Sequence, residues 1–195
     1  MPADDVVKNA IRVGISACLL GHSVRYDGGH KRYDWITEKL ALHVQFVPVC
    51  PEVEFGMGVP RPAIELVQVP DDDDGQGVAD RAVRLFATDT GADLTDAMRG
   101  FAADRVEALA DERLSGYVFK TRSPSCGLTQ VAVFARLNDP EPVARDGRGL
   151  FAEALIARFP GLPITEEHVL DSREARDGFI AAVRRYHGLH HASRP

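Results

Sequence analysis

The order of apolar and amphipathic segments restricts the fold of this chain more than any other feature. Apolar residues alternate with small or polar ones from Ile11 to Ile15, which predicts a strand. Further strands are predicted at 46–49, 64–69, 116–120 and 131–135. Apolar residues at helical spacing predict helices at 33–43, 94–114, 150–159 and 172–187. This order predicts an α/β fold with an open, mostly parallel sheet flanked by helices in Rossmann-like layers.

The chain is expected to form one domain. Its 195 residues are 45% hydrophobic and 27% charged, and no internal repeat or long linker divides them. We predict a single domain at 11–187, a disordered N-terminal extension at 1–10 and a flexible tail at 188–195.

Two groups of potential metal ligands are not expected to bind a metal. Three histidines lie where the last helix is expected to fray into solvent: His187, His190 and His191. The acidic run Asp71–Asp74 resembles part of a calcium loop, but Ala82 stands at the twelfth position, where such a loop needs glutamate. We therefore predict a solvated turn at the acidic run.

Composition argues against several classes of protein. Lys+Arg 23 against Asp+Glu 29 gives a formal net charge of −6, so a nucleic acid is not expected as a partner. No apolar run approaches the roughly 18 residues of a membrane span, and the first residues lack the basic and apolar regions of a secretory signal. Three cysteines are too few, and odd in number, for a disulfide framework. These features predict a cytoplasmic protein, as a monomer or small homo-oligomer.

Each of the three cysteines follows a predicted strand. Cys18 follows the first strand, Cys50 follows the second, and Cys126 follows the strand at 116–120. Ligands of open α/β sheets gather outside the carboxyl ends of the strands, so we expect the three thiols to converge. A single buried cysteine is usually only a small apolar residue. Three cysteines at three strand ends favour a functional site instead.

Three chemistries suit converging thiols. Zinc takes sulfur ligands, but the spacing lacks the C-x-x-C pattern of common zinc sites. A redox pair or persulfide carrier needs two thiols and leaves the third unused. An iron–sulfur cluster bound by three cysteines leaves one iron open to substrate. Ligand type alone does not decide among the three.

Five short motifs surround the cysteines. They are the segments 16–21, 24–28, 48–54, 58–62 and 123–127. In this order and at compatible spacings over residues 11–160, the chain resembles the thiouracil desulfidase (TudS) family, formerly a bacterial domain of unknown function. The resemblance implies a [4Fe-4S] cluster bound by Cys18, Cys50 and Cys126, with one iron open to substrate. It also implies removal of sulfur from a small thiolated nucleobase such as 2-thiouracil, with C=S becoming C=O and sulfide released without net redox change.

The resemblance also implies roles for residues near the cysteines. Attack of water on the thiocarbonyl carbon needs a base, and Glu52 matches the family's catalytic carboxylate. Ser123 matches a hydroxyl beside the substrate or the sulfide; a cap of the Ser-Pro turn is its alternative role. Glu54 is the alternative carboxylate, and Ser125 is interpreted as more structural than catalytic; both are also candidates for substrate contact. The remaining candidates for substrate contact are Arg25, Tyr26, Asp27 and Arg61, with Lys120 and Arg122 as cations beside an anionic cluster or substrate.

Two other functions remain open on the sequence. One is desulfuration of thiolated tRNA nucleosides, against which the net charge of −6 argues. The other is a non-catalytic iron–sulfur carrier or sensor, which would bind the same cluster without needing Glu52.

Overall fold

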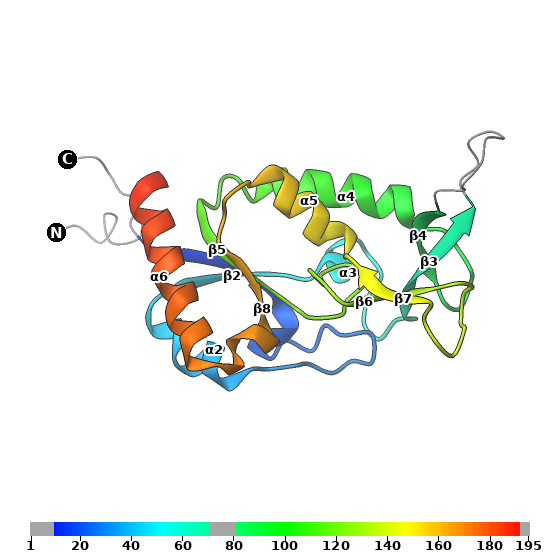
Figure 1. Ribbon diagram of the computed structural model, residues 1–195, viewed down its shortest axis with the longest axis horizontal. Helices are drawn as coiled ribbons and strands as arrows, with labels where there is room; N and C mark the ends of the chain where they lie inside the picture. The colour runs from blue at the N-terminus through cyan, green and yellow to red at the C-terminus, as the bar shows by residue number, and fades with distance from the viewer. Residues whose placement is uncertain (1–9, 71–80, 192–195) are drawn as a thin grey trace.

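The structure is a computed structural model that describes residues 10–70 and 81–191 (Figure 1). The acidic run at Asp71–Asp74 lies outside the described residues, as do nearly all of the predicted N-terminal extension and the last four residues of the predicted tail. The fold is mixed α/β, which confirms the predicted class.

Sheet A is parallel throughout, like the sheet predicted from the sequence. It contains β1 (Arg12–Ser16), β2 (Gln45–Val49), β5 (Leu114–Phe119) and β8 (Ile164–Glu166), in the order β2-β1-β5-β8. All six residues of β5 are buried, as expected for the central strand of a sheet covered on both faces. The three-residue strand β8 was not predicted.

Sheet B shows that the prediction of one mostly parallel sheet is incomplete. It contains β3 (Ile64–Pro70), β4 (Arg81–Ala87), β6 (Val131–Phe134) and β7 (Ala144–Gly147), in the order β4-β3-β6-β7. Strand β3 pairs antiparallel with β4 and parallel with β6, and β6 pairs antiparallel with β7. Because β4 is the next strand after β3 in the chain, and β7 is the next strand after β6, each antiparallel pair forms without a crossover.

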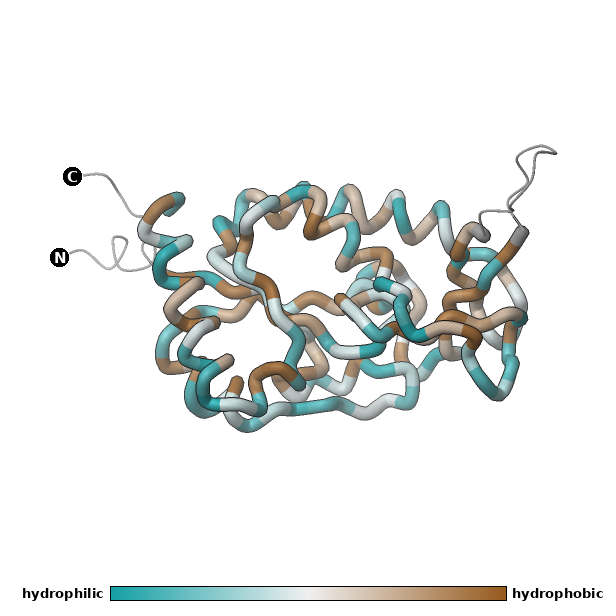
Figure 2. The backbone as a smooth tube through the Cα atoms, viewed as in Figure 1, coloured by the Kyte–Doolittle hydropathy of each residue, from teal (hydrophilic) through white to brown (hydrophobic). Residues whose placement is uncertain are grey.

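Helices cover both faces of sheet A. On one face α4 (Thr95–Ala108) and α5 (Leu150–Arg158) pack side by side over Tyr117 and Phe119 (Figure 1). On the other face α2 (Asp34–Glu38) and α6 (Arg173–His190) pack over Val118. Short turns η1 (Ala17–Leu20), η2 (Leu40–Leu42) and η3 (Glu167–Asp171) and the four-residue helix α3 (Pro51–Glu54) complete the described elements. Hydrophobic and hydrophilic residues alternate along α6 in Figure 2, as expected for a helix with one face on the core.

Two helix predictions need correction. The helix predicted at 94–114 ends at Ala108, and β5 begins at Leu114. Helix α6 continues to His190, beyond its predicted end at His187. The Nδ1 of His187 lies 3.1 Å from the Ser115 hydroxyl, and Nε2 of His191 lies 2.9 Å from the Leu114 carbonyl oxygen. These contacts with β5 hold the helix end against sheet A. No described helix is long and apolar enough to cross a membrane.

Candidate active site

A cavity of about 600 Å³ is lined by all three cysteines. Cys18 lies in η1, directly after β1, and Cys50 lies between β2 and α3. Cys126 lies in the segment that leaves β5. The structure therefore brings together, at the carboxyl ends of parallel strands, the three thiols that are far apart in the sequence.

The loop that carries Cys126 is held by the N-terminus of α5. The carbonyl oxygen of Ser125 accepts hydrogen bonds from the amides of Phe151 (3.0 Å) and Ala152 (3.2 Å). The amide of Gly149 donates to the carbonyl of Gly127 at 2.8 Å. These bonds satisfy first-turn amides that have no partner within their own helix. A Cβ at Gly149 would lie 2.3 Å from the Ser125 carbonyl carbon, so only glycine permits this approach.

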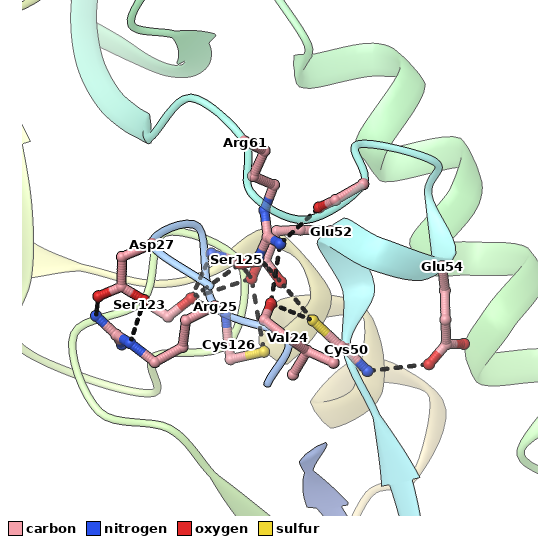
Figure 3. Close-up of polar contacts among 11 residues, drawn as sticks. Val24, Arg25, Asp27, Cys50, Glu52, Glu54, Arg61, Ser123, Ser125 and Cys126 are labelled. Atoms are coloured by element: carbon pink, nitrogen blue, oxygen red, sulfur yellow. Dashed lines mark hydrogen bonds and ion pairs between the residues drawn. The ribbon is translucent and has the colours of Figure 1, made fainter. Parts of the chain in front are cut away.

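Glu52 lies in the cavity wall at the centre of a hydrogen-bond cluster (Figure 3). Its Oε1 accepts a hydrogen bond from the Ser125 hydroxyl at 2.6 Å and a longer one from Ser123 at 3.4 Å. Its Oε2 lies 3.4 Å from the Cys50 sulfur. Glu52 is 9% exposed and Ser125 is fully buried. The carboxylate is thus oriented by serines from the Cys126 loop, beside one of the three thiols.

The position of Ser123 is compatible with both roles considered for it, contact with a substrate and capping of the turn. Its side chain lines the cavity, as a hydroxyl beside a substrate must. The same oxygen accepts the amides of Ser125 at 3.3 Å and Cys126 at 3.2 Å, so it also caps the turn. Ser125 does not line the cavity, and its hydroxyl instead contacts Glu52 and the Cys126 sulfur, the latter at 3.5 Å.

Glu54 points away from the cavity. It is not among the lining residues; its Oε1 accepts the amide of Cys50 at 2.9 Å, and its Oε2 pairs with Arg105 Nε at 2.5 Å. Of the two candidate carboxylates, only Glu52 therefore lines the cavity.

The loop after Cys18 contributes part of the wall. Arg25 and Tyr26 line the cavity, and the Arg25 guanidinium lies 5.3 Å from the centre of the Tyr26 ring. Asp27 is not a lining residue and instead accepts the Gly29 amide at 2.9 Å. That hydrogen bond and the nearby Arg25 hold the pKa of the Asp27 carboxyl below its usual value. Asp27 therefore shapes the turn, while Arg25 and Tyr26 face the cavity.

Arg61 is a buried cation in the wall. Its Nη1 donates to the carbonyl oxygens of Val24 at 2.9 Å and Gly58 at 3.0 Å, and its Nη2 lies 3.8 Å from Glu52 Oε2. Only 5% of its side chain is exposed. Arg61 thus joins the loop that contains Val24 to the loop that contains Gly58, and it places positive charge beside the Glu52 carboxylate.

Part of the cavity wall comes from residues that were not among the sequence candidates. Glu167 and His168 follow β8 and line the cavity, and Lys31 lines it from the loop before α2. Glu167 pairs with the ammonium of Lys120 and accepts the Thr121 amide at 2.8 Å. Glu167 and His168 obey the same strand-end rule as the cysteines. They were missed because the three-residue strand β8 is too short to recognise from its pattern.

The cavity has an excess of positive charge. Two carboxylates line it, Glu52 and Glu167, against five cationic side chains: Arg25, Lys31, Arg61, Lys120 and Arg122. Cations around a cavity favour an anionic occupant. Lys120 and Arg122, which are expected from the sequence to lie beside an anionic cluster or substrate, line the same cavity as the three cysteines.

Burial favours the protonated form of all three thiols in the cluster-free protein. Burial raises the pKa of Cys18 to about 11, although Lys120 opposes the shift. Burial and the Glu52 carboxylate raise the pKa of Cys50 to about 12, and burial raises that of Cys126 well above its usual value. Metal binding must displace these protons, since the thiolate is the ligand.

The donor set fits an iron–sulfur cluster. Three cysteines in one cationic cavity provide soft thiolate ligands and a setting for an anionic group. Within residues 10–70 and 81–191, no three His, Cys, Asp or Glu side chains form a site for a single metal ion. Three cysteines that bind three different irons need not meet at one point.

Comparisons with known proteins agree with these features. A family model described as 2-thiouracil desulfurase matches residues 13–167. A solved structure described as the [4Fe-4S]-dependent thiouracil desulfidase TudS is similar with a TM-score of 0.61 and 26% sequence identity, over 82% of this chain and 93% of that chain. No curated protein matches the sequence. The family match spans most of the domain and every cavity cysteine, and the chain therefore belongs to the 2-thiouracil desulfurase family.

Proposed function

We propose that the protein is an iron–sulfur-dependent desulfidase that converts the C=S group of a small thiolated nucleobase, such as 2-thiouracil, to C=O. The observation that supports it most is the shared cavity of Cys18, Cys50, Cys126 and Glu52. The similar TudS structure is described as [4Fe-4S]-dependent and as a thiouracil desulfidase.

Cys18, Cys50 and Cys126 are the residues that would bind the cluster. Once bound, a [4Fe-4S] cluster with three cysteine ligands supplies a Lewis-acidic iron that is open to the soft thiocarbonyl sulfur.

Glu52 acts as the base in this proposal. Its carboxylate takes a proton from water as the water oxygen forms a bond to the thiocarbonyl carbon. Glu52 gives this proton to the thiocarbonyl sulfur and then takes the second proton from the added hydroxyl, so that the C=O bond forms as the C–S bond breaks. The second proton also passes to the departing sulfur, which leaves as hydrogen sulfide. The balance is C=S plus water giving C=O plus hydrogen sulfide, with no electron gained or lost. The hydrogen bond from Ser125 and the nearby Arg61 keep the carboxylate oriented during these steps.

Anaerobic reconstitution with iron and sulfide tests the cofactor. We expect a brown protein with about four irons per chain, the content of one [4Fe-4S] cluster. Replacing Cys18, Cys50 or Cys126 singly by alanine should abolish the cluster. Colourless wild-type protein after reconstitution would contradict the proposal.

Turnover of 2-thiouracil to uracil and sulfide tests the reaction. Glu52→Gln should keep the cluster but lose turnover by about 10²- to 10⁴-fold, the usual contribution of a general base. Full turnover in Glu52→Gln contradicts the role of Glu52. A cluster without any turnover in the wild type would instead favour a carrier or sensor, and preference for thiolated tRNA over the free base would overturn the substrate class.

A further inference from the structure

Glu54 contacts Cys50 through both its main chain and its side chain. The Glu54 amide donates to the Cys50 carbonyl oxygen at 2.9 Å, and Glu54 Oε1 accepts the Cys50 amide, also at 2.9 Å. Figure 3 shows that the amide nitrogen of Cys50 faces Glu54, whereas its sulfur faces Glu52. Glu54 therefore fixes the backbone of Cys50 on the side opposite the thiol.

Helix α4 holds Glu54 in turn. Arg105 Nε lies 2.5 Å from Glu54 Oε2. One turn earlier on α4, the Phe101 ring packs edge-on against Phe55, with centroids 5.9 Å apart. Residues four apart lie on the same helix face, so α4 presents one continuous surface to the end of α3. The contact chain runs from α4 through Arg105 and Glu54 to the amide of Cys50.

The four-residue helix α3 cannot keep its place alone. A single helical turn is unstable without tertiary contacts, and α3 carries Glu52 while Cys50 stands at its N-terminus. A hydrogen bond from a backbone amide to a charged carboxylate is among the stronger kinds in proteins. The Arg105–Glu54 pair thus helps to hold α3 in place, and with it the backbone from which the Cys50 sulfur and the Glu52 carboxylate project.

We propose that Glu54, held by Arg105, is a positioning residue that orients Cys50 for cluster binding and Glu52 for proton transfer. This inference rests on the proposed function and deepens it, because it assigns Glu54 a role outside the chemical step.

The first measurement needs no cluster. In cluster-free protein, hydrogen exchange at the Cys50 amide should be slow in the wild type and only moderately faster in Glu54→Gln, whose single amide oxygen can still accept the hydrogen bond but which loses the ion pair with Arg105. Exchange should become at least tenfold faster in Glu54→Ala and in Arg105→Met, because the acceptor is removed or released. Wild-type protection of this amide in Glu54→Ala would overturn the inference even if the protein binds no cluster.

The second measurement uses reconstituted protein. Glu54→Ala and Arg105→Met should release iron to a chelator about 10- to 100-fold faster than the wild type, the usual effect of losing a residue that orients a metal ligand. Glu54→Gln, which keeps one acceptor oxygen but loses the ion pair with Arg105, should release iron at a rate between those of the wild type and Glu54→Ala and should lose far less turnover than Glu52→Gln. Loss of turnover in Glu54→Gln as severe as in Glu52→Gln, with the cluster retained, would make Glu54 a catalytic carboxylate and overturn the positioning role.

The chain provides a matched control pair. Glu107, also on α4, accepts two hydrogen bonds from Arg158 of α5, at 2.6 and 3.0 Å. This ion pair joins two helices outside the cavity lining. Glu107→Ala should leave iron release and Cys50 amide exchange at wild-type rates. Equal effects of Glu107→Ala and Glu54→Ala on both rates would mean that any loosening of α4 matters, which also overturns the specific role of Glu54.

Discussion

The hydroxyl of Ser125 lies 2.6 Å from Oε1 of Glu52. This hydrogen bond joins the loop that carries Cys126 to the helix that begins after Cys50. Ser125 is fully buried, so water does not compete with it for the carboxylate. The serine interpreted as structural is therefore the nearest described partner of the proposed base.

Replacing Ser125 by alanine should slow the reaction more than it harms the fold. Loss of a hydrogen bond to a charged group costs about 1.5–3 kcal/mol, which corresponds to roughly 10- to 100-fold in kcat if the bond orients Glu52 in the transition state. Steady-state kinetics on the reconstituted enzyme measure this loss in kcat. Iron content provides the control, and wild-type kcat in Ser125→Ala would show that the contact does not serve catalysis.

Replacing Gly149 by alanine should displace the Cys126 loop. The new Cβ would lie 2.3 Å from the Ser125 backbone, so the loop or the start of α5 must shift. We expect a loss of about 1–3 kcal/mol in the free energy of unfolding, as for other overpacked sites, together with weaker cluster binding. Chemical denaturation and iron content measure the two effects.

Gly100→Ala is the control for this substitution. Gly100 lies inside α4 with open space where its Cβ would be. Alanine there should stabilise the protein by roughly 0.5–1 kcal/mol and leave iron content unchanged. If Gly149→Ala behaves like Gly100→Ala, the close approach of α5 to the Cys126 loop does not position Cys126.

Removing the Tyr117 hydroxyl should not destabilise the protein. This oxygen is buried and has no hydrogen-bond partner among the residues that the structure describes. Tyr117→Phe keeps the ring packed against Phe119 and is expected to leave the free energy of unfolding unchanged or raise it by about 1 kcal/mol.

The ring itself matters more than its hydroxyl. A Cβ at Gly14 would lie 2.2 Å from the Tyr117 ring, so Gly14→Ala should cost about 1–3 kcal/mol. Thermal unfolding of both variants measures these effects. Destabilisation by Tyr117→Phe as large as that by Gly14→Ala would show that the hydroxyl has a partner.

Local patterns in the sequence were enough to identify several strands and to show that the cysteines follow their ends. Alternation from Ile11 to Ile15 and the buried segment at 46–49 identify β1 and β2, because side-chain period and apolar content are local properties. The strand-end rule then places Cys18 and Cys50 at one edge of a parallel sheet. The same rule holds for Glu167 and His168 but could not be applied from the sequence, because the three residues of β8 show no strand pattern of their own and form a strand by pairing with β5.

The sequence alone determined the α/β class, the motifs around the cysteines and the types of ligand available. Only the tertiary structure divided the strands between two sheets and placed Glu52, but not Glu54, in the cavity lining. Successive residues of a helix are rotated by about 100°, so the side chains of two residues that are two positions apart point in nearly opposite directions. Which direction faces the cavity depends on what packs against α3. The Arg105 contact fixes Glu54 outward and the Ser125 hydroxyl fixes Glu52 inward, and both partners come from distant parts of the chain.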